Sequence, residues 1–127
     1  MSRFTTVLIV QPDVDERTAK LMTPLVYESD LLGETITVPA GFETDFASVP
    51  RMFWNLIPPL GRYGEAAVVH DWLYRTQDYA RATCDAVLLE AMEVCEVGWC
   101  TRMTIYGAVR AFGWAAWNSD KERLITK

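Results

Sequence analysis

A histidine followed at once by an aspartate is the part of this sequence best suited to chemistry. His70 is the only histidine in the chain, and Asp71 follows it within the apolar stretch 64–74. At helical period the two residues fall on neighbouring stripes of a helix that is otherwise apolar nearly all round, which predicts burial. A buried imidazole and a buried carboxyl need partners, because an unpaired charge in a protein interior is costly.

A second carboxylate is placed to meet the histidine. Asp85 lies on a helix predicted to begin by about residue 80, on a face that is otherwise apolar. The apolar members of that face are Leu88, Leu89, Met92 and Cys95. Two helices joined by a short link pack antiparallel, so we expect Asp85 beside His70. A buried Asp can fix the tautomer of an imidazole and stabilise its protonated form. Tyr106 on the next helix is a candidate donor to Asp85.

These parts suit a calcium-assisted hydrolase. His70 would act as the general base on a water molecule, and Asp85 would orient the imidazole. Asp71, with backbone carbonyls of the loop at Gly61 and Gly64, would hold a hard cation that polarises the substrate carbonyl. Oxygen ligands favour calcium over zinc. The three scattered cysteines and single histidine lack the paired spacing of a zinc site.

A non-catalytic interpretation explains the same residues. A core histidine can bond through its ring nitrogens to backbone or to a structural carboxylate, with Asp71 turned toward an arginine. Asp45, in a loop between two aromatic residues, would accept backbone N–H groups of its own turn or reach toward His70. The sequence leaves both interpretations open.

The sequence pattern around these residues predicts an α+β fold. We expect the chain, residues 1–127, to form a single domain that is long enough to bury one core. Residues 1–48 are β-rich and predict a small antiparallel sheet or hairpin, packed on a bundle of about three helices within residues 49–117. Residues 118–127 read as a polar tail.

Within the β-rich part, the run 5–10 is rich in β-branched residues and predicts a strand. The runs 24–28 and 34–38 predict a hairpin. In the helical part, Asp78 is a plausible cap for the helix that carries Asp85, and Gly98 is expected to end it. A third helix is predicted over residues 99–117.

Composition narrows the possible functions. The net charge is -5, with 12 basic and 17 acidic residues and no basic run. The sequence therefore lacks the basic patch by which proteins bind nucleic acid. Three cysteines, an odd number inside helical patterns, indicate a reduced chain and not a disulfide scaffold. No apolar run is long enough for a transmembrane segment. We expect a protein made in a cytoplasm.

Four separate strings, in order, resemble the bacteriophage and prophage family known as domain of unknown function 1353. The strings are Val38 to Phe42, Thr44 to Pro50, Pro58-Pro59 and His70 to Tyr74. The resemblance spans roughly residues 22 to 117. It implies a phage-encoded protein, present in the host cytoplasm or incorporated in the virion.

A second resemblance, over about residues 58 to 92, is to phospholipase A2. The order His70, Asp71, Tyr74, followed by a helix that carries Asp85, is similar to the helix pair of the bacterial and parvoviral members. This resemblance implies that His70 is the base, Asp71 a calcium ligand and Asp85 the partner of the histidine. The loop before the helix has fewer glycines than that family's calcium loop and contains Arg62.

Three functions follow as alternatives. One is hydrolysis of a phospholipid or other ester during phage entry or release. Another is a non-catalytic tail, baseplate or assembly component, whose partners are other phage structural proteins. The third is a host-takeover protein that binds a bacterial partner. Access separates the first two, because a catalytic His70 must be reachable from a groove.

Overall fold

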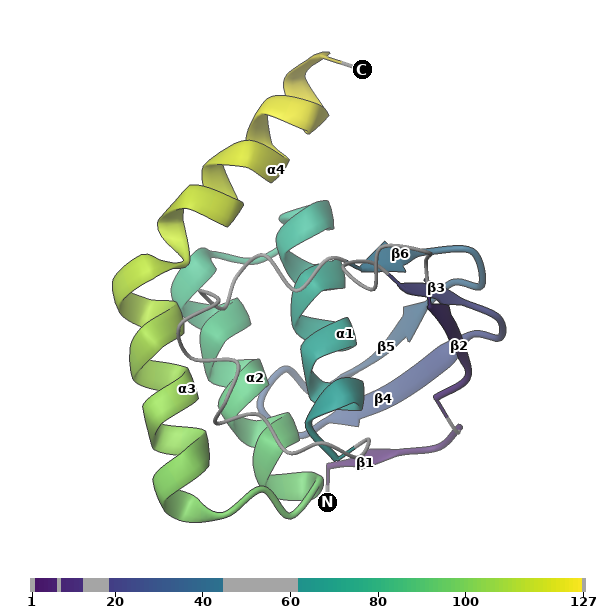
Figure 1. Ribbon diagram of the computed structural model, residues 1–127, viewed down its shortest axis with the longest axis vertical. Helices are drawn as coiled ribbons and strands as arrows, with labels where there is room; N and C mark the ends of the chain where they lie inside the picture. The colour runs from purple at the N-terminus through teal and green to yellow at the C-terminus, as the bar shows by residue number, and fades with distance from the viewer. Residues whose placement is uncertain (1, 7, 13–18, 45–61, 127) are drawn as a thin grey trace.

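The structure is a computed structural model, and it describes residues 2–6, 8–12, 19–44 and 62–126. Within these ranges, short antiparallel strands come first in the chain and helices follow (Figure 1). The predicted α+β fold is confirmed. The strands are β1 (Arg3–Phe4), β2 (Val10–Pro12), β3 (Ala19–Leu21), β4 (Leu25–Ser29), β5 (Glu34–Val38) and β6 (Glu43–Thr44). The helices are α1 (Arg62–Thr76), α2 (Arg81–Val94), α3 (Trp99–Phe112) and α4 (Trp114–Thr126).

The strands form two three-stranded sheets, ordered β1-β4-β5 and β2-β3-β6. The β4–β5 hairpin is confirmed, with Leu25 opposite Val38 and Ser29 opposite Glu34. Gly33 in its turn has a φ of 64°, which a glycine adopts without steric cost. The strand predicted over residues 5–10 is wrong, because β1 ends at Phe4 and β2 begins only at Val10.

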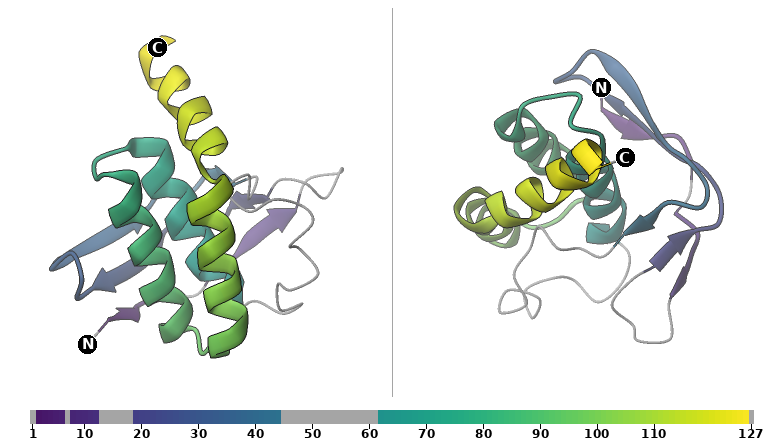
Figure 2. Two further views of the ribbon diagram at one scale, coloured as in Figure 1. Left: turned by 90° about the vertical axis from the view of Figure 1, so that its left-hand side faces the viewer. Right: turned by 90° about the horizontal axis from the view of Figure 1, so that it is seen from above.

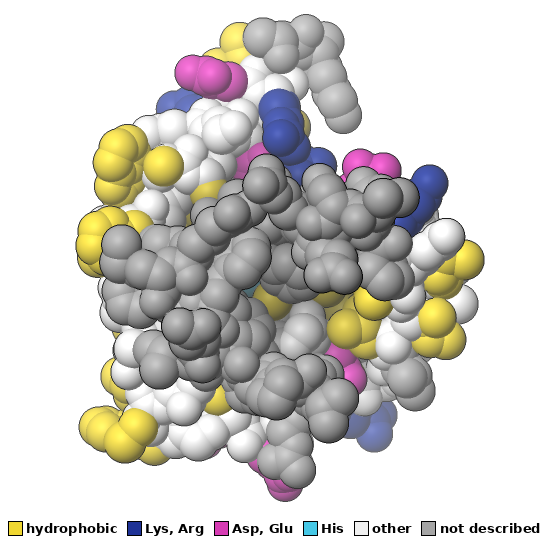
Figure 3. Space-filling view, in the orientation of Figure 1, with side chains coloured by type: hydrophobic (Ala, Val, Ile, Leu, Met, Phe, Trp, Pro, Cys, Tyr) yellow, Lys and Arg dark blue, Asp and Glu magenta, His cyan; other side chains and the backbone are white. Residues whose placement is uncertain are grey.

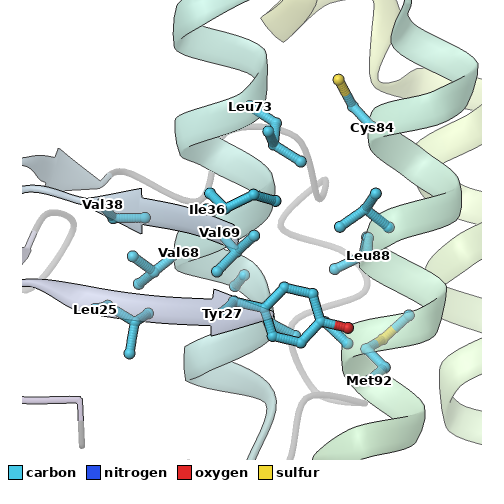
Figure 4. Close-up of a cluster of buried hydrophobic side chains, with 14 of the residues drawn as sticks. Leu25, Tyr27, Ile36, Val38, Val68, Val69, Leu73, Cys84, Leu88 and Met92 are labelled. Carbon is cyan, nitrogen blue, oxygen red and sulfur yellow. The ribbon is translucent and has the colours of Figure 1, made fainter. Parts of the chain in front are cut away.

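Helix α1 lies in the middle of the molecule, between the strands and α2 (Figures 1 and 2). Residues 66–71 are all buried, which agrees with a helix that is apolar nearly all round. Figure 4 shows how side chains from three directions meet to form the core. They include Leu25 and Tyr27 from β4, Ile36 and Val38 from β5, Val68 and Val69 from α1, and Leu88 and Met92 from α2.

The ends of α2 differ from those predicted. Ala80 precedes its first residue and no side chain caps this end, so Asp78 is not the cap. At the other end Glu96, with a φ of 61°, takes the left-handed position, and the Val97 amide bonds to the Met92 carbonyl at 2.9 Å. This is the Schellman arrangement, and buried Val97 packs over the helix end in it. Gly98 instead precedes α3.

The predicted third helix is divided in two. Helix α3 ends at Phe112, and α4 covers most of the segment for which the sequence predicts a polar tail. The start of α4 is tied to α1: Gln77 donates to the Trp117 carbonyl at 2.8 Å, and Arg75 pairs with Asp120. The later turns of α4 project beyond the other helices (Figures 1 and 2).

Candidate functional site

A buried carboxylate, Asp85 on α2, is the centre of a hydrogen-bond cluster between three helices. His70 Nε2 lies 2.8 Å from Asp85 Oδ1, and the Tyr74 hydroxyl donates to the same oxygen at 2.6 Å. Arg110 of α3 donates to Oδ2 at 2.8 Å. Asp85 is 0% exposed and His70 is 1% exposed. We call these four residues the Asp85 cluster.

Two short local features place the first helix against the second. Helix α1 ends where Gln77 takes a left-handed backbone conformation and its amide bonds to the Leu73 carbonyl. The chain then reverses within four residues and α2 begins at Arg81. The link is so short that the middle of α1, with His70 and Tyr74, meets the first turns of α2. Their spacing of four residues puts both side chains on the same face of α1.

The protonation of the cluster follows from its contacts. Burial disfavours the charged form of Asp85, but the hydrogen bonds from His70, Tyr74 and Arg110 outweigh it and lower the pKa of this carboxyl. Burial and the nearby carboxylate raise the pKa of Tyr74 well above its ordinary value. At neutral pH the cluster therefore contains an ionised Asp85 and a neutral Tyr74 that donates to it.

A second arginine joins the carboxylate to the end of α3. Arg81 Nη1 lies 3.6 Å from Asp85 Oδ2, and its guanidinium donates to the carbonyls of Val109 and Arg110 at 3.2 Å each. These carbonyls belong to the last turn of α3, and that of Val109 also accepts from the Gly113 amide at 2.7 Å. Arg81 therefore couples the charge of Asp85 to the end of α3.

The junction between α3 and α4 is packed directly onto this cluster. A Cβ atom on Gly113 would lie 2.5 Å from the Val109 carbonyl oxygen and 2.8 Å from the Tyr74 hydroxyl. Only a residue without a side chain fits at that distance. The ring of Tyr74 also contacts Trp117 edge to face, with centroids 5.2 Å apart. Close packing therefore requires a glycine at the junction of α3 and α4.

Asp71 does not join the Asp85 cluster. It is buried and accepts a hydrogen bond from the Thr44 hydroxyl of β6. Because Asp71 follows His70 by one residue, its side chain leaves α1 about 100° further round and meets a different element. Asp71 therefore connects α1 to the β2-β3-β6 sheet.

A calcium ion takes six to eight oxygen ligands. Gly64, expected in a loop, lies in the first turn of α1. Gly61 and Asp45 lie outside the described residues. Within the described ranges no three His, Cys, Asp or Glu side chains are grouped so that they could hold a metal ion. The predicted calcium ligands, Asp71 with backbone carbonyls at Gly61 and Gly64, remain a prediction.

Sequence reasoning found the His70–Asp85 contact through helical periodicity but missed both arginines. Tyr106 makes no hydrogen bond to Asp85, and Tyr74 donates in its place. Tyr74 lies four residues after His70 on the same face of α1, and this spacing was a signal that could have found it. Arg81 had a similar signal in its i, i+4 spacing from Asp85, whereas the reach of Arg110 from α3 depends on helix packing.

Residues 19–109 match the family described as "Protein of unknown function (DUF1353)". The match covers more than half of the chain, so the protein belongs to this family. No curated protein and no solved structure matches the chain. None of the helices in the described ranges is long and apolar enough to cross a membrane.

Proposed function

We propose that this protein is a phage-encoded hydrolase of carboxylic esters, with His70 as the general base and Asp85 as the residue that orients it. The observation that carries the proposal is the 2.8 Å contact between His70 Nε2 and a fully buried carboxylate. A buried, ionised Asp fixes the imidazole tautomer and stabilises the imidazolium that forms during proton transfer.

The reaction assigns one task to each member of the cluster. The His70 imidazole, held by Asp85, takes a proton from water, and the water oxygen attacks the ester carbonyl carbon. When the tetrahedral intermediate collapses, the C–O bond to the alcohol breaks and the imidazolium returns its proton to the leaving oxygen. The products are a carboxylic acid and an alcohol. Tyr74 and Arg110 hold Asp85 in place and touch no reacting atom.

Phospholipid acyl esters are the substrates we propose first, with other esters next. The support is the resemblance of the His70, Asp71, Tyr74 and Asp85 pattern to phospholipase A2, together with the contacts among three of these residues. The same proposal includes a calcium ion, for which Asp71 would be a ligand.

A non-catalytic role is the second candidate, and a specific observation favours it. His70 is 1% exposed, whereas a catalytic imidazole must be reachable by its substrate. His70 bonds to Asp85 of α2 and Asp71 to Thr44 of β6, as expected for groups that hold α1 against its neighbours. In that case the protein acts through its partners, which we propose to be other phage structural proteins in a tail or baseplate.

Hydrolysis of phospholipid vesicles and of a soluble ester by the purified protein, with calcium and with chelator, tests the proposal. His70→Asn should lower kcat by roughly 100- to 10,000-fold, the contribution of a general base. The matched control is Glu90→Gln, which changes another carboxylate on α2 outside the cluster and should leave kcat unchanged. Absence of hydrolysis by the folded wild type under every condition would favour the structural role.

A further inference from the structure

The guanidinium of Arg110 on α3 reaches both the buried cluster and the surface of the molecule. Its Nη1 donates to Asp85 Oδ2 at 2.8 Å, and the side chain is 36% exposed. An arginine carries further donors on Nε and Nη2, along the other edge of the guanidinium. Within the described ranges, Asp85 is the only acceptor that the Arg110 guanidinium contacts. The other edge is therefore able to bind an additional anion.

Arg81, the second arginine near Asp85, is engaged differently. Its guanidinium donates to two carbonyls at the end of α3, and its side chain is 22% exposed. The negative end of the helix dipole matches a cation at this position. Arg81 is therefore fully used within the fold. Of the two arginines around the one carboxylate, Arg110 is the one with capacity for a ligand.

The surroundings of Arg110 on α3 favour an anion that also carries apolar groups. Residues 99–119 contain no Asp or Glu that would repel an anion. Figure 3 shows hydrophobic side chains along the left-hand edge of the molecule, which α3 forms. Trp99 and Met103 lie on the same stripe of α3 as Arg110, at 64% and 36% exposure. A free phosphate gains nothing from these side chains, whereas a lipid does.

Asp85 joins Arg110 to the proposed base. His70 Nε2 lies 2.8 Å from Oδ1, and Arg110 Nη1 lies 2.8 Å from Oδ2 of the same carboxylate. The imidazole and the guanidinium are thus separated by the width of one carboxylate. In a glycerophospholipid the central acyl ester and the phosphate are attached to neighbouring carbons of the glycerol. The negative charge of such a ligand therefore lies only a few bonds from the ester carbonyl.

We propose that Arg110 binds the phosphate of a glycerophospholipid and thereby makes the hydrolase specific for phosphate-bearing esters. The choice of substrate rests on the proposed hydrolase function. Nε and Nη2 form charge-assisted hydrogen bonds with two phosphate oxygens, a geometry to which arginine is suited, and Nη1 keeps its contact with Asp85. An ester without phosphate lacks this contact. Arg110 touches no reacting atom, and no bond to phosphorus is made or broken.

Isothermal titration calorimetry tests the proposal without catalysis. The probes are a short-chain diether phosphatidylglycerol, which has no ester to hydrolyse, the corresponding dialkylglycerol without phosphate, and glycerol phosphate without chains. The wild type should bind the first probe at least roughly tenfold more tightly than either of the others, as expected for hydrogen bonds to a charged group. Equal affinity for the lipid with and without phosphate would overturn the proposal. Glycerol phosphate that binds as tightly as the lipid would assign Arg110 to a free phosphate compound and overturn it too.

Substitution of Arg110 should remove the preference for the phosphate-bearing probe. Arg110→Gln loses the charge and the preference, and Arg110→Lys, which keeps the charge, should retain part of it. The matched control is Arg102→Gln, the same change on α3 at a residue that donates to the Val97 carbonyl outside the cluster. This variant should keep the full preference. Far-UV circular dichroism establishes that each variant is folded, and an unchanged preference in folded Arg110→Gln would contradict the assignment.

Kinetics separate this role from the support that Arg110 gives to Asp85. Loss of that support lowers kcat for every ester. Loss of phosphate binding raises KM for the phospholipid by roughly tenfold and leaves KM for a neutral soluble ester unchanged. If the wild type hydrolyses no ester, the hydrolase proposal fails, whereas the calorimetric preference still places a phosphate-bearing lipid at Arg110. Hydrolysis without that preference would overturn the role of Arg110 alone.

Discussion

Helix α2 carries two carboxylates that face opposite sides of the molecule and have different partners. Asp85 faces α1 and α3, where its partners are a histidine, a tyrosine and two arginines. Glu90 faces the β4–β5 hairpin. It accepts hydrogen bonds from the Tyr27 and Ser29 hydroxyls at 2.7 Å and from the Leu31 amide at 2.9 Å.

The difference lies in what each cluster can do with a proton. Both carboxyl groups have lowered pKa values, because hydrogen bonds to the charged form outweigh the cost of burial. The partners of Glu90 are hydroxyls and a backbone amide, which do not titrate near neutral pH. Only Asp85 contacts an imidazole, the side chain suited to proton transfer at that pH. We therefore interpret Glu90 as a clamp between helix and hairpin, and Asp85 as part of a proton-transfer pair.

The largest expected effect is on stability when each carboxylate is removed. Asp85→Ala leaves buried His70 and two arginines without their anion and should cost about 3–5 kcal/mol in the free energy of unfolding. Glu90→Ala leaves neutral donors nearer the surface and should cost about 1–3 kcal/mol. Urea unfolding measures both, and exposed Glu93→Ala on the same helix is the control. Equal costs for the two substitutions would remove the distinction between the clusters.

Removal of one hydroxyl from each cluster should have a smaller effect. Tyr74→Phe deletes a fully buried hydrogen bond to a charged acceptor and should cost about 1.5–3 kcal/mol. Tyr27→Phe should cost about 1 kcal/mol, since Ser29 still donates to the same oxygen of Glu90. Thermal unfolding measures both. If the hydrolase proposal holds, Tyr74→Phe also lowers kcat whereas Tyr27→Phe does not, and the reverse order would contradict our assignment.

The smallest expected effect is the pH dependence of the clamp. The pKa of Glu90 is lower in the folded chain than its ordinary value of 4.5. Its contribution is therefore complete above the unfolded pKa and is lost as the pH falls through the folded pKa. The difference in free energy of unfolding between the wild type and Glu90→Gln should stay constant above about pH 6 and shrink below about pH 4.5. If this difference in free energy of unfolding instead grew in acid, the folded chain would disfavour the ionised form of Glu90, and its pKa would be raised.

Much of the fold and part of the site follow from local sequence. Alternation in residues 34–38 predicts the β4–β5 hairpin, and the apolar surroundings of His70 predict a buried helix. Periodicity also places Asp85 on an inward face. These features are set by residues within a few turns of one another, so the period of the side chains is sufficient to find them.

Only the tertiary structure decided which groups complete the site. Arg110 and Tyr74 bond to Asp85 and Tyr106 does not, because the rotation of each helix and the reach of a long side chain depend on how the helices pack. The direction of Asp71 toward Thr44 depends likewise on where β6 lies. The junction of α3 and α4 requires Gly113 because the Tyr74 hydroxyl occupies the space a side chain would need. The sequence determined which residues are buried, and packing determined which of them meet.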